Sequence, residues 1–417
     1  MPMDSRAVVN PDGGTERVVT ALSPQLTLLF AITCALAVAN VYFAQPLLAS
    51  MSASLSVPAS RIGAVVGATQ VGYAVGLLLV VPLGDLFDRK KLILTQLLLS
   101  ALALSVVGLA QSWSLLLGAM VLVGLMAVVV QVVVACAATL ASPDQRGQAV
   151  GTVTSGVVLG ILLARLVSGV VADFAGWRGV YFLSSALMVA MALVLYRTLP
   201  ASHTPRARVG YWQLLGSVLH LYRSERVLRD RGILALLIFA AFSVLWTSMV
   251  LPLSAPPLSL SHTQVGLFGL AGVAGALAAA RAGRLADQGH GQRTTGVALA
   301  LLTLSWLPTA FGEHSLLAMV AGVVLLDFAV QAVHVTNQSL IFAARPDAQS
   351  RLVGAYMGFY SVGSGLGAVA ATCTYAQWGW AAVCALGASL SVLALLFWVY
   401  QVRSGRQVRS GRQVRSG

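Results

Sequence analysis

The sequence predicts an all-α membrane protein in which twelve transmembrane helices form two pseudo-symmetric six-helix bundles. The first observation is the composition: 58% of the 417 residues are hydrophobic and 9% are charged, whereas soluble domains are about 25% charged. The second is a series of apolar runs about as long as a bilayer-spanning helix, which needs about 20 residues. The third is an internal repeat that relates the two halves of the chain. Together these observations exclude a soluble or a disordered protein.

The predicted spans divide the chain into five parts. A cytoplasmic tail (1–23), a first bundle (24–198), a linker (199–231), a second bundle (232–401) and a basic tail (402–417) follow one another. An even number of spans places both ends of the chain on one side of the membrane. The spans are expected at 24–49, 59–83, 92–111, 115–140, 148–172, 177–198, 232–253, 263–281, 294–312, 315–342, 352–376 and 380–401.

The charges indicate which side that is. The chain carries 26 Lys and Arg residues against 13 Asp and Glu residues, a net charge of +13. Of those 26, 23 lie in the tails and in the connections on one face of the predicted bundles. Lys and Arg accumulate in cytoplasmic loops, so we expect this face and both termini in the cytoplasm. The surplus is therefore explained by topology and does not indicate a nucleic-acid partner, which would require a basic face on a folded, soluble domain.

Two polar segments lie outside the spans. In the linker, Tyr211, Trp212, Leu215, Val218 and Tyr222 recur at helical spacing between arginines, which predicts an amphipathic helix on the inner leaflet. The alternative is a solvated linker with a partly ordered turn. The tail repeats Arg-Gln-Val-Arg-Ser-Gly without an apolar face, and we expect it to be a disordered basic extension.

The two halves are copies of one another. The segment 84–88 after the second span matches 283–287 after the eighth, and Val130-Gln131 matches Val330-Gln331. Each copy has six spans, so both copies have the same orientation and are related by an axis along the membrane normal. Such repeats are typical of transporters whose two bundles rock around a central site.

Glycine is concentrated in the second, fifth, eighth and eleventh spans, which are equivalent positions of the two copies. Small residues allow helix backbones to approach closely. These spans are therefore expected to form the sliding interface between the bundles. The alternative is ordinary close packing within each bundle.

Three ionisable residues are predicted to lie at membrane depth, where charges are costly and usually functional. They are Arg165 in the fifth span and Asp327 and His334 in the tenth. Asp327, Gln331, His334 and Gln338 share one helix face. This polar stripe must line a cavity or face the other bundle.

The stripe suggests a proton-coupling site. Desolvation raises the pKa of a carboxyl group and a nearby arginine lowers it, so a site that alternates between the two environments binds and releases a proton. Asp327 with Arg165 would supply this switch, and His334 would relay protons toward the cytoplasm. Two alternatives stay open: a fixed Asp327–Arg165 ion pair that locks the bundles, and contact with substrate without proton exchange.

The twelve spans, the 6+6 repeat, the loops at 84–91 and 283–287, and the segments 40–46 (NVYFAQP) and 160–165 (GILLAR) resemble the major facilitator superfamily over nearly the whole chain. The most similar branch is that of bacterial twelve-span drug:proton antiporters. The resemblance implies conformational gating loops that contain Gly84, Asp88, Arg89, Gly283 and Asp287. In these loops Asp88 would latch the cytoplasmic side of an outward-open state, and the alternative is that these charges only set topology.

The resemblance also implies a substrate cavity lined by spans one, four, seven and ten. Amides and aromatic rings with little charge favour neutral or weakly cationic organic molecules over phosphorylated anions. The candidate lining residues are Asn40, Tyr42, Gln45, Gln131, Trp246, Gln331 and Asn337.

The predicted function is a secondary active transporter that works by alternating access and exports a small organic or drug-like compound in exchange for protons. We expect a functional monomer in the bacterial inner membrane, with a small-molecule substrate, protons and the bilayer as partners. The alternatives are a sugar or metabolite exporter or facilitator without proton coupling, and a non-transporting membrane sensor. An enzyme, a cofactor or a metal site is not expected, because the sequence has no HExxH motif, no Walker motif and no Cys/His cluster.

Overall fold

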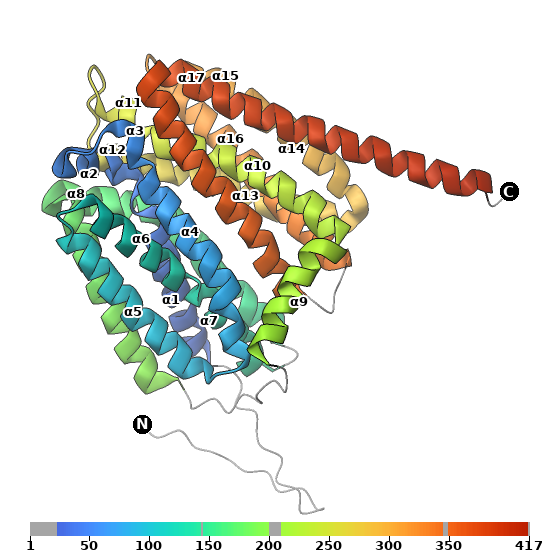
Figure 1. The fold of residues 1–417 in the computed structure, drawn as a ribbon, viewed down its shortest axis with the longest axis horizontal. Helices are drawn as coiled ribbons and strands as arrows, with labels where there is room; N and C mark the ends of the chain where they lie inside the picture. The colour runs from blue at the N-terminus through green and yellow to red at the C-terminus, as the bar shows by residue number, and fades with distance from the viewer. Residues whose placement is uncertain (1–22, 143–144, 200–209, 345–348, 416–417) are drawn as a thin grey trace, which may run out of the picture.

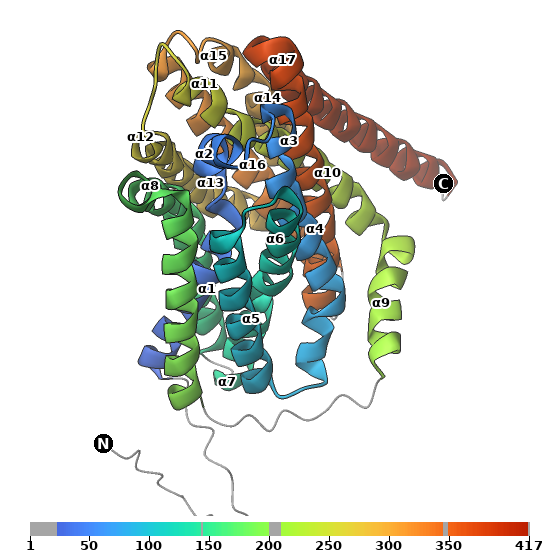
Figure 2. The same ribbon diagram turned by 60° about the vertical axis from the view of Figure 1, so that its left-hand side comes forward.

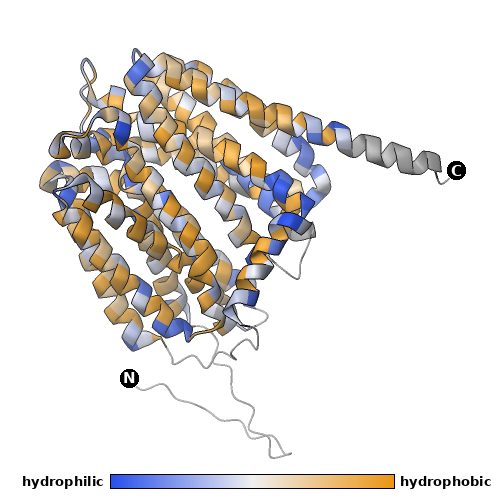
Figure 3. Cartoon of the chain, viewed as in Figure 1, coloured by the Kyte–Doolittle hydropathy of each residue, from blue (hydrophilic) through white to orange (hydrophobic). Residues whose placement is uncertain are grey.

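The computed structural model describes residues 23–142, 145–199, 210–344 and 349–415, and every regular element in these ranges is helical (Figure 1). Within these ranges, eight helices are long and apolar enough to cross a membrane. Hydrophobic residues follow the lengths of the helices, and hydrophilic residues gather toward their ends (Figure 3). The structure confirms the all-α membrane fold.

The N-terminal bundle begins with a helix that is broken near its end. Its elements in chain order are α1 (Pro24–Tyr42), η1 (Gln45–Leu47), α2 (Leu48–Leu55), α3 (Ala59–Ile62), α4 (Ala64–Leu79), η2 (Val81–Asp85), α5 (Arg89–Leu109), α6 (Trp113–Ala127), α7 (Val129–Leu140) and α8 (Arg146–Thr198). One further helix, α9 (Tyr211–Ser224), lies between the bundles in sequence.

The C-terminal bundle repeats this order with more breaks. Its elements are α10 (Arg226–Ser248), α11 (Val250–Ser254), α12 (His262–Leu267), η3 (Phe268–Ala271), α13 (Gly272–Leu285), η4 (Ala286–His290), α14 (Gly291–Leu304), α15 (Trp306–Ala310), α16 (Leu316–Ala344) and α17 (Gln349–Arg415).

Two of the long helices each contain two spans. Gly176 in α8 has φ 67° and Gly379 in α17 has φ 73°, a backbone conformation that glycine adopts without steric cost. Both positions fall between predicted spans, and α17 forms two arms that meet at a sharp bend (Figure 1). With α8 and α17 counted as two spans each, the eight helices become ten. The broken segments α12–α13 and α14–α15 occupy the positions of predicted spans eight and nine.

The two ends of the molecule differ in how the bundles meet. We call the end with η2, α9 and η4 the basic end, and the end where α8 and α17 bend the opposite end. At the opposite end a Cβ on Gly63 would collide with Ala368 of the other bundle, and one on Gly169 would collide with His262. At the basic end, Gly151 and Gly354 face open space. The bundles therefore converge at the opposite end.

The helix α9 bridges the bundles at the basic end, as Figures 1 and 2 both show. The Tyr211 hydroxyl donates to the Leu79 carbonyl of α4 (3.0 Å), and the Tyr222 hydroxyl donates to the Ala355 carbonyl of α17 (2.7 Å). Val218 is buried against the protein, whereas Trp212 is 78% exposed. The exposed ring is available for a lipid headgroup layer, and this membrane contact stays a prediction.

The glycine-rich helices serve both of the roles considered for them. Toward the opposite end, Gly67 of α4 packs on α17 and Gly266 of α12 packs on α8, both across the bundles. Further along the same two spans, Gly72 of α4 packs on α6 and Gly275 of α13 packs on α16, both within one bundle. The interface between the bundles therefore uses one half of each of these spans.

At the C-terminus, the structure continues α17 as a helix to Arg415. The disordered extension that the sequence predicts from residue 402 stays a prediction. Extending an existing helix fixes one residue for each hydrogen bond gained, whereas starting a new one is costly. Because the tail directly follows a transmembrane helix, it needs no nucleation of its own.

Gly156 provides a test of close packing within the N-terminal bundle. A Cβ at this position would overlap the Ala31 carbonyl of α1. We expect Gly156→Ala to lower the free energy of unfolding by about 1–3 kcal/mol, the usual cost of overpacking, as measured by thermal denaturation in detergent. Gly151→Ala, on the same helix but facing open space, is the matched control and should leave Tm unchanged. An equal fall in both variants would contradict the packing argument.

Candidate substrate and coupling site between the bundles

Arg165 is a buried cation at the interface of the two bundles. Its side chain lies on α8 and is 2% exposed. Nε donates a hydrogen bond to Oε1 of Gln45 on η1 (2.7 Å). The guanidinium lies over the ring of Trp246 on α10, 3.7 Å from the ring centroid, and also near Tyr42 (5.1 Å) and Phe242 (5.7 Å). Aromatic faces attract the desolvated cation, so Arg165 joins an N-terminal helix to a C-terminal one.

One nitrogen of Arg165 is left for another partner. Nη2 is buried and makes no hydrogen bond to any described residue. Arg165 lines a small cavity together with Gln45, Trp246, Met249 and Val250. A buried donor without an acceptor costs about 1–3 kcal/mol, so an acceptor atom that enters this cavity would be favoured.

Asp327 contacts the same tryptophan from α16. The carboxylate is 4% exposed, and Oδ1 accepts a hydrogen bond from Nε1 of Trp246 (2.9 Å). Within the described residues, Asp327 and Arg165 form no direct ion pair. Trp246 therefore contacts both charges, with its N–H toward the carboxylate and its ring face toward the guanidinium.

A second buried cluster surrounds His334, two helical turns further along α16. Nδ1 of His334 lies 3.0 Å from the hydroxyl of Tyr356 on α17. The same hydroxyl accepts from Nδ2 of Asn337 (3.5 Å), and Oδ1 of Asn337 accepts from Arg231 of α10 (3.4 Å). This cluster lies within the C-terminal bundle and extends toward the basic end.

Aromatic rings join the two clusters. The hydroxyls of Tyr42 and Tyr360 are 2.6 Å apart and connect α1 with α17. The Tyr360 ring packs on Phe239 (4.3 Å between centroids), and Phe239 packs on His334 (5.1 Å). Because Phe239 carries no hydrogen-bonding group, the described side chains provide no continuous hydrogen-bonded path from Asp327 to His334. A relay through His334 would need water.

Three predicted cavity residues lie outside these clusters. Asn40 accepts a hydrogen bond from Ser184 (2.5 Å), which ties α1 to α8 within one bundle. Gln131 donates to the Tyr73 hydroxyl at 3.5 Å. The Gln331 side chain packs against Gly275 of α13. Tyr42, Gln45, Trp246 and Asn337, in contrast, belong to the connected set.

The predicted gating loop is held within its own bundle. Asp88 caps α5, and its Oδ1 accepts from the backbone N–H groups of Lys90 (2.8 Å) and Lys91 (3.3 Å). Arg89 donates to the carbonyls of Gly84 and Ala135 (3.1 Å each). In this state, in which the bundles diverge at the basic end, Asp88 makes no described contact with the C-terminal bundle.

The equivalent loop of the second copy has one described packing contact. Gly283 packs against Val335 of α16, which belongs to the same bundle. Asp287 lies on η4, and its side chain is outside the described part of the structure. A latch in this copy therefore stays a prediction.

Four aromatic residues that were not predicted from the sequence complete the site, namely Phe239, Phe242, Tyr356 and Tyr360. All four are buried. Tyr356 and Tyr360 are one helical turn apart and share a face of α17. That spacing was a usable signal, but span eleven was not among the spans expected to line the cavity.

The comparisons with known proteins agree with this architecture. The family model described as Major Facilitator Superfamily matches residues 30–287 and 231–415. The chain belongs to the major facilitator superfamily. Its relatives include a putative uncharacterized transporter of Escherichia coli, YgaY, which is 47% identical over 377 residues, 90% of this chain and 95% of that protein. A probable transporter of Streptomyces coelicolor is 31% identical over 366 residues, 88% of this chain and 85% of that protein.

Solved structures of this superfamily show the same fold. A bacterial homologue of the human lysosomal transporter Spinster, in an inward-facing and unoccupied conformation, superimposes with a TM-score of 0.76 at 17% sequence identity. The match covers 90% of this chain and 96% of that one. The protein is thus a major facilitator transporter of the membrane, as the sequence predicted.

Trp246→Phe tests whether the tryptophan supports Asp327. This change keeps an aromatic face near Arg165 and removes the N–H that contacts the carboxylate. A buried acceptor then loses its donor, so we expect the free energy of unfolding to fall by about 1–3 kcal/mol, as measured by thermal denaturation. The control is Trp378→Phe, since Trp378 is 69% exposed. In an Asp327→Leu background, which has no acceptor for the Trp246 N–H, the cost should shrink; an unchanged cost there would exclude the contact as its cause.

Proposed function

We propose that this major facilitator exports a small organic compound in exchange for protons, with Arg165, Trp246 and Asp327 as the coupling site. The observation that carries this proposal is that a buried acid and a buried cation, supplied by different bundles, contact the same tryptophan. Rocking of the bundles changes the separation of these two charges. The proton affinity of the carboxyl group would change with it.

The partners of each charge support a moving cation and a stationary acid. Asp327 and Trp246 lie on α16 and α10 of the same bundle, so their hydrogen bond is independent of the relative position of the bundles. Arg165 and Gln45 both belong to the other bundle and would move together. Asp327 would release its proton when the guanidinium approaches and bind one when it withdraws.

The orientation that we propose places the basic end in the cytoplasm, following the distribution of Lys and Arg. The state described here would then be open toward the cytoplasm and closed toward the outside. Likeness to an inward-facing structure of the superfamily supports this assignment. In an exporter, this is the state that receives substrate from the cell.

The walls of the site suggest the class of substrate. Buried Tyr, Phe and Trp rings provide flat apolar surfaces, and Nη2 of Arg165 provides one donor for an acceptor atom. The opposite charges of Arg165 and Asp327 leave little net charge. We therefore propose neutral or weakly cationic planar organic molecules that carry a carbonyl or a similar acceptor.

Asp327→Asn is the direct test of coupling. The amide keeps the shape and an acceptor for Trp246 but cannot exchange a proton. With a panel of dyes, drugs and sugars in inverted membrane vesicles, we expect the pH gradient to drive accumulation by the wild type and to have no effect on the variant. Asp230→Asn is the control, because Asp230 pairs with Arg226 (3.5 Å) on α10 at the basic end, outside the site.

Persistence of gradient-driven transport in Asp327→Asn would refute the coupling role of this residue. Transport by the wild type that ignores the pH gradient would instead favour a facilitator or a metabolite exporter without proton coupling. If the wild type moves no compound in the panel, the proposal of drug-like substrates fails.

Arg165→Lys separates charge from shape at the same site. Lysine keeps the positive charge but loses the planar guanidinium that stacks on Trp246 and bonds to Gln45. We expect the maximal transport rate to fall about tenfold, as a lost desolvated cation–π contact predicts, while dependence on the pH gradient persists. Arg178→Lys is the control, since Arg178 stacks on Trp177 (4.2 Å) away from the site. Loss of gradient dependence in Arg165→Lys would show that the shape of the group, rather than its charge, sets coupling.

A further inference from the structure

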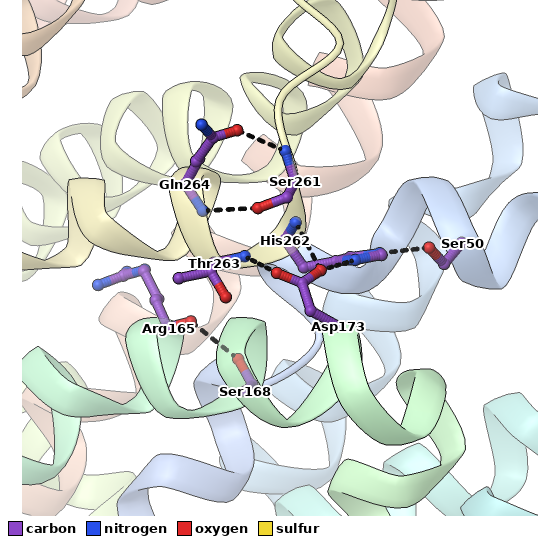
Figure 4. A network of polar contacts seen from close by, with 8 residues as sticks. All are labelled: Ser50, Arg165, Ser168, Asp173, Ser261, His262, Thr263 and Gln264. Atoms are coloured by element: carbon purple, nitrogen blue, oxygen red, sulfur yellow. Dashed lines mark hydrogen bonds and ion pairs between the residues drawn. The ribbon is translucent and has the colours of Figure 1, made fainter.

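At the opposite end, a carboxylate of one bundle accepts hydrogen bonds from the start of a helix in the other bundle. Oδ1 of Asp173 on α8 accepts from the backbone N–H of His262 on α12 (3.1 Å) and lies 2.8 Å from Nδ1 of the same residue. Oδ2 accepts from the backbone N–H of Thr263 (2.9 Å). Figure 4 shows the carboxylate facing these groups from below. Every one of these contacts crosses between the bundles.

His262 also reaches a second element of the N-terminal bundle. Its Nε2 lies 2.5 Å from Oγ of Ser50 on α2. The two ring nitrogens are therefore held by two different elements of the same bundle. One imidazole side chain thus fixes α12 to both α8 and α2.

The chain around His262 is rigidly placed. Ser261 and Gln264 cap the start of α12 reciprocally, with Ser261 N–H donating to Oε1 of Gln264 (2.9 Å) and Gln264 N–H donating to Oγ of Ser261 (3.3 Å). Gly169, one turn before Asp173, lets the α8 backbone approach the His262 carbonyl. The capped start of α12 and the close approach of α8 therefore hold the groups that contact Asp173 in place.

We propose that Asp173, His262 and Ser50 form a polar lock that closes the outer gate of this transporter and must break before the opposite end can open. The lock goes beyond the proposed function, because it would control opening for any substrate and for any coupling ion. Its position at the point where the bundles converge gives it this role.

The environment of the lock suits a contact that forms and breaks in each cycle. The side chains of His262 and Asp173 are 29% and 27% exposed, so water can replace the broken hydrogen bonds. The other charged side chain near the bend of α8, Arg178, donates to Ser54 (2.8 Å) and Ala110 (3.0 Å) of its own bundle. Within the described parts of α2 and α12, His262 is the sole ionisable side chain.

The Asp173 carboxylate stays charged over the physiological range. Partial burial by itself raises the pKa of Asp173, but hydrogen bonds from Thr263, His262 and Ser261 outweigh it and hold that pKa well below its usual range. A group whose pKa is lowered stabilises the closed state above its ordinary pKa and loses this effect only as the pH falls through the lowered value. Acidification from pH 8 to 5 should therefore leave the Asp173 carboxylate, and its hydrogen bonds from the start of α12, in place.

The lock and the coupling site share one helix. Arg165 and Asp173 are two turns apart on α8, and in Figure 4 Arg165 extends away from the lock. Release of Asp173 from α12 would free this end of α8 to move. The same motion would withdraw the guanidinium from Trp246.

The test measures gate opening without transport. Spin labels are placed at Leu115 on α6 and Phe311 after α15, which are 47% and 65% exposed and lie at the opposite end on different bundles. The four native cysteines, Cys34, Cys136, Cys373 and Cys384, are first replaced. Double electron–electron resonance on the purified protein then gives the distance distribution between the labels.

We expect one short distance in the parent protein, at pH 8 and at pH 5. Asp173→Asn and His262→Gln should each increase the ratio of open to closed populations about fivefold, the typical effect of losing a partly exposed contact to a carboxylate. The double variant should add little to either single change, because both remove the same contact.

Arg178→Gln is the matched control, since it removes a charge from the same helix without removing a contact between the bundles. Unchanged distances in both lock variants would overturn the proposal, and so would an equal opening in Arg178→Gln or a fully additive double variant. Because the labels report distance alone, these results are independent of whether protons or any compound are transported.

Discussion

The buried guanidinium of Arg165 is the constraint on which the centre of this protein depends. A charge at membrane depth is tolerated only where the protein supplies partners for it. Gln45 satisfies Nε, and the rings of Trp246 and Tyr42 face the cation. Since these partners come from both bundles, the burial of one side chain ties the position of one bundle to that of the other. The electrostatic environment of Asp327 therefore depends on the position of the N-terminal bundle, which carries Arg165.

Glycine makes this arrangement possible. A Cβ on Gly266 would collide with the backbone carbonyl of Arg165, and one on Gly269 would lie 3.1 Å from its Cβ. The α12–η3 segment can therefore lie directly on α8. At one end of this contact Asp173 comes within reach of α12, and at the other end Arg165 lies beside α10. The packing of α8 on the α12–η3 segment thus accounts for the close backbone approach, the polar lock and the buried cation.

The sequence predicts the helices well because span length and apolarity are local properties. It also singles out Arg165 and Asp327, since any charge within an apolar run is conspicuous. It does not show that Trp246 contacts both, because that depends on how two bundles meet. Tyr360 is missed for the same reason, and so is Asp173, a carboxylate just beyond a span whose partners are backbone N–H groups about 90 residues away.

The most direct measurement of the central claim is a structure of the protein trapped with the opposite end open and the basic end closed. In that state the hydrogen bond from Trp246 Nε1 to Asp327 should persist, because both residues belong to the C-terminal bundle. Arg165 should have left the face of the Trp246 ring and taken Gln45 with it. If Arg165 remains stacked on Trp246 as it is here, at 3.7 Å, the two charges do not change their relation during the cycle, and the coupling mechanism is contradicted.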